Sequence, residues 1–388
     1  MTYAQRTDHL RPEGAYQVLA RAQELEAQGK HIIHLEIGEP DFVTPSHVSL
    51  AGIRAIANGQ TRYNPPAGMT PLREAIAEYA GRLRGISIKP SQVVVSPGAK
   101  PNLFFPTLAL VNPGDEVIYP DPGFPTYEAM IGVAGGIPVA VPLLEKNGFS
   151  FDLDAFDQLV NPKTKLIILN SPSNPTGGVI PQAHLEHIAA AAIENDCWVL
   201  SDEIYNQLVF DNAQAPSIAS IPGMLERTII MDGFSKTYAM TGWRLGYGIM
   251  PEGLANRVSL LLTHSIGCTA HFTQIAGIEA LTGPQDYVNM MVKEYQRRRD
   301  LLVNALNQIP GISCLKPHAT FYTFPNIKAT GKTSNELANL FLDGGVAVLP
   351  GSAFGKYGEG YLRIVFANSY ENIEIALERM DKVLRKFA

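Results

Sequence analysis

The segment GFSKTYAMTGWRLGYG, residues 233–248, combines one lysine and one arginine with several hydroxyl-bearing side chains. It follows an apolar run, residues 228–231, that is typical of a buried strand, so Lys236 is expected near the end of a sheet. Lysine is among the residues least often buried without a partner. Lys236 therefore needs either a buried partner or a chemical role.

Polar side chains follow other apolar runs as well. In an open parallel sheet, ligands bind beyond the carboxyl ends of the strands, so these positions are the first candidates for a site. Each residue alone has an ordinary explanation; Asp202, for example, could be a helix N-cap. Several strand ends with such side chains indicate one shared site, and its candidate members are Asn174, Asp202, Tyr205, Ser235, Lys236 and Arg244.

The segment PGAK, residues 97–100, also follows an apolar run and opens an apolar helix. Free backbone N–H groups and the helix dipole favour an anion at such a position. A simple strand-to-helix turn is the better explanation of this segment when it is taken alone.

Metal and nucleotide motifs are weaker. His264, Cys268 and His271 stand at i, i+4 and i+7 and could share a helical face, but no fourth ligand accompanies them, so no metal site is predicted. GFSKT lacks the second glycine of a phosphate-binding P-loop. No G-x-G-x-x-G motif follows the first predicted strand, so a dinucleotide fold lacks its fingerprint.

Composition narrows the class of protein. The 388 residues are enough for two or three domains, and the net charge of −6 argues against a nucleic-acid partner. The three cysteines are an odd number and lie far apart, which favours a reducing compartment. The N-terminal residues are too polar for a secretory signal, so we expect a soluble cytoplasmic protein.

Continuous apolar runs alternate with helical segments from about residue 90 onward. Such runs fit strands covered on both faces of a mostly parallel sheet. After Pro251 long helices follow, and then a smaller α+β unit with apolar runs at 320–327, 346–351 and 361–366. The seven runs assigned to the main sheet are residues 92–96, 116–120, 138–143, 165–170, 197–202, 228–232 and 245–250.

Four of these segments together resemble a known family. SPSNPTGG, SDEIY, SKTYAMTGWRLGYG and YLRIVFA, in this order, are similar to the class I and II aminotransferases of fold type I, which use pyridoxal 5'-phosphate (PLP). The similarity runs from EIGEPDF at 36–42 to the final helix. Within the class, the chain resembles the aspartate aminotransferases of the thermophile type. The resemblance implies a large PLP-binding α/β domain at 48–282 and a smaller, discontinuous α+β domain at 1–47 and 283–388.

The resemblance assigns roles around the PLP ring. Lys236 would form the Schiff base with the PLP aldehyde and later move the proton from the substrate Cα to the C4' carbon. Asp202 would keep the ring nitrogen protonated. Tyr205 and Asn174 would hydrogen-bond the phenolic oxygen, and Phe124 would stack on the ring, although plain core packing also explains an aromatic there.

The phosphate group would be held by a mixed set of donors that combines an arginine fork with a helix terminus. Tyr63 resembles a tyrosine that reaches the phosphate from the other subunit, which implies a homodimer with two-fold symmetry. The donors expected from within the chain are Arg244, Ser235 and the backbone N–H groups of Gly98, Ala99 and Lys100.

The substrate would be an amino acid held at both ends. Arg363 matches the bidentate partner of the α-carboxylate, and Gly38 matches the position where the backbone closes on that carboxylate. The subgroup uses a lysine at the position of Lys100 for a side-chain carboxylate, so aspartate or glutamate is the expected donor. The cycle would be ping-pong, with a 2-oxo acid such as 2-oxoglutarate as acceptor.

Other functions stay open at this point. Lys100 could serve only the phosphate end while His264, Ile266 and His271 line a roomier pocket, as in an aromatic or broad-specificity aminotransferase. A PLP-dependent lyase would use the same lysine and aspartate. A PLP-binding regulator needs an attached DNA-binding domain, for which the chain leaves little room, and its charge is acidic.

Overall fold

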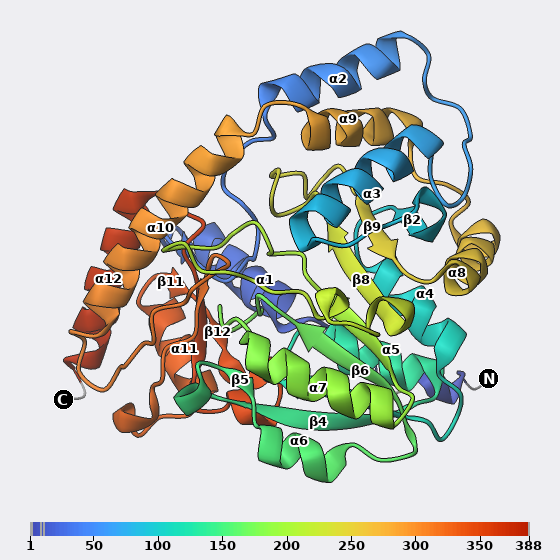
Figure 1. Cartoon of the computed structure of the whole chain (residues 1–388). Coiled ribbons are helices and arrows are strands. Elements are labelled where there is room, and N and C mark those ends of the chain that lie inside the picture. The colour runs from blue at the N-terminus through green and yellow to red at the C-terminus, as the bar shows by residue number, and fades with distance from the viewer. Residues whose placement is uncertain (1–2, 8–9, 11, 387–388) are drawn as a thin grey trace.

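The structure is a computed structural model that describes residues 3–7, 10 and 12–386, and an eight-stranded sheet forms its centre (Figure 1). The five strands in the middle of the sheet run parallel, whereas β9 is antiparallel to both of its neighbours and β5 is antiparallel to β4. In spatial order the strands are β2 (Val93–Ser96), β9 (Gly246–Ile249), β8 (Thr228–Gly233), β7 (Trp198–Asp202), β6 (Thr164–Asn170), β3 (Glu116–Asp121), β4 (Ile137–Leu144) and β5 (Ser150–Phe151).

The predicted α/β class is confirmed, and all seven predicted strands belong to this sheet. The eighth, β5, is a two-residue strand at the edge, too short to give a sequence pattern. The continuous apolar runs arise because both faces are covered. In β6, Leu166 and Ile168 pack into the core on one face, and Ile167 and Leu169 pack into the core on the other.

Three groups of helices cover the sheet (Figure 1). The face that buries Leu166 packs against α4 (Pro101–Leu110), α5 (Thr126–Ala134) and α8 (Glu252–Ser265). The opposite face packs against α6 (Leu153–Leu159) and α7 (Gln182–Glu194). Near β2, β9 and β8 the cover consists of α2 (Ser46–Ala57), α3 (Thr70–Arg84) and α9 (His271–Thr282), with α2 against α9.

The C-terminal part forms a smaller unit around a second core. Its helices are α10 (Asp286–Leu306), α11 (Ser334–Asp343) and α12 (Tyr370–Leu384). Its three-stranded sheet has the order β10 (Tyr322–Thr323), β13 (Leu362–Val365) and β12 (Leu349–Pro350). A separate pair joins β1 (Ile33–His34) to β11 (Val346–Ala347) in parallel. The run at 346–351, predicted as one strand, is thus divided between two sheets.

The N-terminal segment packs against this smaller unit. Besides the β1–β11 pair, α1 (Gly14–Ala27) contacts β11 and β12. On the basis of these contacts, we propose that residues 1–47 and 283–388 form a discontinuous small domain. Short 3-10 helices complete the described elements at Gln5–Thr7, Pro90–Gln92, Glu145–Asn147, Ile218–Ser220, Leu225–Arg227, Lys328–Thr330, Gly351–Phe354 and Lys356–Gly358.

One expectation about a helical face is wrong. His264, Cys268 and His271 do not share a helix, because α8 ends at Ser265 and α9 begins at His271. Gly267 ends the first helix with a positive φ of 84° and donates its N–H to Leu262 O. In the described part of the chain, no cluster of three or more His, Cys, Asp or Glu side chains could hold a metal ion. Among the described helices, none has the length and apolarity needed to cross a membrane.

Candidate active site

A cavity of about 550 Å³ lies where β3, β6, β7 and β8 end. The start of α1, the residues after β1 and two residues of the three-stranded sheet complete its wall. The structure therefore brings together side chains that are up to 350 positions apart in the sequence, as the separation of Glu13 and Arg363 shows. The predicted residues that line it are Gly38, Ala99, Lys100, Phe124, Asn174, Asp202, Tyr205, Ser235, Lys236, Arg244 and Arg363.

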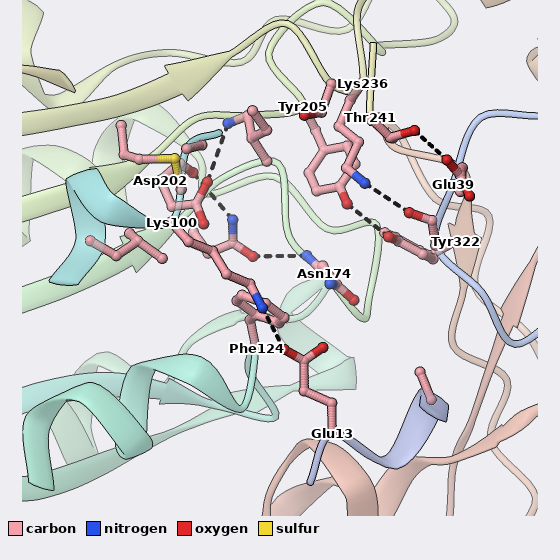
Figure 2. A pocket seen from close by; sticks show the side chains of 18 of the residues that line it. Glu13, Glu39, Lys100, Phe124, Asn174, Asp202, Tyr205, Lys236, Thr241 and Tyr322 are labelled. Atoms are coloured by element: carbon pink, nitrogen blue, oxygen red, sulfur yellow. Dashed lines mark hydrogen bonds and ion pairs between the residues drawn. The ribbon is translucent and has the colours of Figure 1, made fainter. Parts of the chain in front are cut away.

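Lys236 lies just after β8 and points its amine into the cavity (Figure 2). Its Nζ donates a hydrogen bond of 2.7 Å to the carbonyl oxygen of Gly38. Burial lowers the pKa of Lys236 to about 8. A Cβ on Gly38 would lie 2.2 Å from Tyr322 Oη, so only glycine lets the backbone come this close. The lysine is thus held next to the backbone segment that was expected to close on a substrate carboxylate.

Asp202 is the last residue of β7 and only 3% exposed. Tyr127 Oη donates a 2.6 Å hydrogen bond to its Oδ2, and the N–H of Ile204 donates to its Oδ1 at 3.3 Å. Burial raises the pKa of the carboxyl group to about 7. A turn rather than a helix follows, so Asp202 is not a helix N-cap. Sequence reasoning missed Tyr127, whose only signal was its position three residues after Phe124.

A buried ionic network lies behind Asp202. Arg84 of α3 donates to Glu203 Oε2 at 2.8 Å and to Asp232 Oδ2 at 3.1 Å. Asn206 and Tyr247 also donate to Asp232. The positive charge of Arg84 thus balances the carboxylates of Glu203, which follows Asp202, and of Asp232, which lies in β8 shortly before Lys236.

The start of α4 forms an anion cradle. Gly98 has a positive φ of 84°, and a Cβ there would lie 2.3 Å from Arg244 Nη2. Among the described residues, none accepts a hydrogen bond from the backbone N–H groups of Gly98, Ala99 or Lys100. With the guanidinium of Arg244 and the hydroxyl of Ser235 on the same cavity, these donors are suited to a phosphate group.

Arg363 lies in β13 of the three-stranded sheet and is 4% exposed, and its guanidinium lines the cavity. Its Nη1 donates to Asn174 Oδ1 at 3.1 Å, and its Nη2 donates to the carbonyl oxygen of Glu36. The guanidinium stacks 4.7 Å from the ring of Tyr322. The buried Nε has no partner in the described part of the chain. Arg363 therefore keeps donor capacity that suits a carboxylate.

Tyr205 and Tyr322 share a hydrogen bond of 2.7 Å between their hydroxyl groups (Figure 2). Tyr205 was predicted for the site, whereas Tyr322 was missed because its sequence context, TFYTF, reads only as an apolar strand. The side-chain Nδ2 of Asn174 donates to none of the described residues. Asn174 Nδ2 is therefore a donor for an anionic ligand oxygen, and the Tyr205 hydroxyl can donate to the same oxygen when it accepts its hydrogen bond from Tyr322.

Two further predicted residues lie apart from the cavity lining. Gly98 is not itself a lining residue, but its backbone lies against the guanidinium of Arg244, which is. Tyr63 is 96% exposed and outside the cavity. Its loop is nevertheless fixed, because Asn64 donates to Thr269 O and accepts from Gln274. His264, Ile266 and His271 also lie outside the lining of this chain's cavity.

A buried lysine, a buried carboxylate and an anion cradle at the carboxyl ends of a parallel sheet form the set of groups that a PLP-dependent α/β enzyme of fold type I requires. The comparisons agree. The family model of the class I and II aminotransferases matches residues 30–380, and the chain belongs to this family.

Individual relatives differ in the substrate that they are named for. The aspartate aminotransferase of Pyrococcus abyssi is 44% identical over 94% of each chain. The aromatic-amino-acid aminotransferase 2 of Thermococcus litoralis is 40% identical over 100% of this chain and 99% of its own. The solved structure of aspartate aminotransferase from Thermus thermophilus with maleate is 37% identical, with a TM-score of 0.94, and covers 99% of this chain and 100% of its own.

The residues present fit PLP, the cofactor of this family. Asp202 is a buried carboxylate without a cationic partner in the described chain, which suits a protonated ring nitrogen. The unpaired N–H groups at 98–100 suit its phosphate group. The amine of Lys236, with its lowered pKa, suits its aldehyde.

Proposed function

We propose that the chain is an aminotransferase of acidic L-amino acids, aspartate or glutamate, with a 2-oxo acid such as 2-oxoglutarate as acceptor. The observation that carries the proposal is the placement of two cationic side chains on the cavity that also holds Lys236. Both line this cavity, where Arg363 would bind the α-carboxylate of the substrate and Lys100 would bind a second carboxylate.

Bound PLP would supply an electrophilic aldehyde and a ring that stabilises negative charge at the substrate Cα. Asp202 would hold a proton at the ring nitrogen, and Tyr127 would keep the carboxylate in position. The phosphate would be held by Ser235, Arg244 and the N–H groups at 98–100. Tyr205 and Asn174 would donate to the phenolic oxygen, and Phe124 would cover one face of the ring.

Lys236 would act as the base and then the acid of the reaction. Its lowered pKa leaves a useful fraction of neutral amine near pH 7 to 8, as proton abstraction from the substrate Cα requires. Arg363 would fix the α-carboxylate so that the Cα–H bond faces Nζ. The carbonyl of Gly38, which accepts from Nζ, would hold the amine near that position.

Lys100→Ser tests the substrate class. We expect a KM for aspartate raised about tenfold or more and a KM for phenylalanine changed less than twofold, because only the acidic side chain loses a charge-assisted hydrogen bond. Lys89→Ser is the matched control, because Lys89 pairs with Glu252 outside the cavity. Equal effects of Lys100→Ser on both substrates would reject the acidic assignment.

An aromatic or broad-specificity aminotransferase is the second candidate. Tyr16 and Phe124 line the same cavity, and relatives are named for aromatic as well as acidic substrates. The same kinetic comparison separates the two candidates. A wild-type preference for phenylalanine that Lys100→Ser leaves intact would favour the aromatic assignment.

We also propose that the enzyme is a homodimer in which Tyr63 completes the site of the partner subunit. The loop that carries Tyr63 is anchored and its ring is exposed, as expected for a residue that contacts a second subunit. The neighbouring helix α2 supports a second copy as the occupant. It buries Val48 and Ala55 toward α9, and it exposes a second apolar face with Leu50 and Ile53.

A further inference from the structure

The amine of Lys100 already has a carboxylate partner within the chain. Glu13 Oε1 and Lys100 Nζ form a close ion pair beside the ring of Phe124 (Figure 2). Both side chains line the cavity that contains Lys236 and Arg363. The proposed subsite for an acidic side chain is therefore occupied by a side chain of the protein itself.

The position of Glu13 favours this pairing over a structural role. Glu13 is the N-cap residue of α1, but its side chain makes no capping hydrogen bond to that helix. The carboxylate turns instead toward Lys100, 87 positions away in the sequence. The side chain of Glu13 does not stabilise α1 through a capping hydrogen bond, so its position in the cavity needs another explanation.

Charge sets this pair apart from the other groups of the cavity. Lys236, Arg244 and Arg363 donate to neutral oxygens, namely backbone carbonyls and the amide of Asn174. Among the described lining residues, Glu13 is the one carboxylate that forms an ion pair with a lining cation. Burial lowers the pKa of Arg363, and the charge of Glu13 is among those that oppose the shift.

We propose that Glu13 determines specificity as an internal stand-in for the substrate's side-chain carboxylate, exchanged for it when an acidic substrate binds and retained when an aromatic one binds. The inference rests on the proposed function, and it names the residue that lets one site accept both classes.

The exchange is physically reasonable because the pair is weak. The side chains of Lys100 and Glu13 are 50% and 31% exposed, and ion pairs of this kind contribute little net stability. An incoming carboxylate therefore loses little in displacing Glu13. An aromatic side chain would leave the pair in place and meet a neutralised Lys100, instead of having to desolvate an unpaired ammonium group.

Glu13→Gln tests the inference in the holoenzyme. We expect the KM for aspartate to fall about two- to fivefold, because the competing carboxylate is removed, and the KM for phenylalanine to stay equal or rise slightly. The dissociation constants of maleate, a dicarboxylate, and of 3-phenylpropionate should show the same split in a spectroscopic titration. Glu24→Gln is the control, because it removes the same charge from an exposed position of α1 that does not line the cavity.

A second background shows whether Glu13 acts through Lys100. In Lys100→Gln, adding Glu13→Gln should change neither KM, because the shared partner is gone. An unchanged aspartate KM in the single variant, or equal shifts for both substrates, overturns the inference while the proposed function stands. A wild-type enzyme that transaminates neither aspartate nor phenylalanine overturns the proposed function first, and the inference with it.

Discussion

At the scale of single residues, burial shifts the two central groups of the site toward their neutral forms. It lowers the pKa of Lys236 to about 8 and raises the pKa of Asp202 to about 7. Each shift makes the ionised form costly in the cofactor-free protein. A protonated ring nitrogen beside Asp202 would stabilise the ionised form of this carboxyl group. The cofactor-free site lacks such a cation and is therefore suited to bind a cationic heterocycle.

This cost predicts that Asp202→Asn raises the melting temperature of the cofactor-free protein, and more so at pH 8 than at pH 5. Because the folded-state pKa lies above that of the unfolded chain, the carboxyl group stabilises the fold only while protonated, and this contribution is lost as the pH rises through about 7. The amide cannot ionise and so avoids the penalty. Thermal denaturation at both pH values measures the difference.

The same variant should bind PLP more weakly, since the partner of the ring nitrogen is lost. Tyr127→Phe serves as the comparison, because it removes the hydrogen bond to Asp202 and keeps the carboxylate. A melting temperature that responds equally to Asp202→Asn at the two pH values would contradict the burial argument.

Sequence reasoning found the residues that stand directly after predicted strands or in recognisable motifs, such as Lys236 and Asp202. It missed Tyr127, Tyr322 and Glu13. Their partners are 75, 117 and 87 positions away, respectively. No local pattern encodes such contacts, because they arise only when the sheet is assembled.

At the scale of elements, strands with both faces buried were predictable from continuous apolar runs. The two-residue strands β1, β5, β10, β11 and β12 were either missed or predicted with inexact boundaries, since two residues carry no period. The antiparallel direction of β9 has no sequence signature either. The α8–α9 break was missed because the histidine and cysteine spacing mimics a helical face, whereas Gly267 ends the helix.

The contact between α3 and the end of the sheet gives an element-scale prediction. Arg84→Met should destabilise the fold by about 3 to 5 kcal/mol, because it leaves the buried carboxylates of Glu203 and Asp232 without their cation. Arg82→Met is the matched control, since Arg82 is exposed on the same helix. Chemical denaturation of the two variants side by side measures the difference, and equal midpoints would show that the network is not needed for stability.

At the scale of the whole molecule, the cavity depends on segments from both ends of the chain. Asp121, at the end of β3, accepts hydrogen bonds from the N–H groups of Lys356 and Tyr357. A Cβ on Gly355 would lie 2.1 Å from Asp121 Oδ1, so the backbone is in close contact there. This contact holds the C-terminal unit against the sheet and thereby keeps Arg363 in the same cavity as Lys236.

The dimer extends this argument to two chains and can be tested by mixing inactive subunits. Lys236→Ala and Tyr63→Ala homodimers should both have low activity at limiting PLP, the first for lack of the amine and the second for weak phosphate binding. If Tyr63 serves the partner's site, a mixed dimer has one site with both residues intact. Random exchange then restores roughly a quarter of the wild-type sites, since half of the dimers are mixed and one site in each is complete.

The control is a mixture of Lys236→Ala with Asp202→Asn subunits carrying intact Tyr63. Both changes then lie in residues of the chain that forms the cavity, so each site of a mixed dimer keeps one defect and no activity returns. If Tyr63 instead serves its own chain, the Tyr63→Ala mixture behaves like this control. Restoration in one mixture and not in the other therefore distinguishes a shared site from two independent ones, because the total number of altered residues per dimer is the same in both.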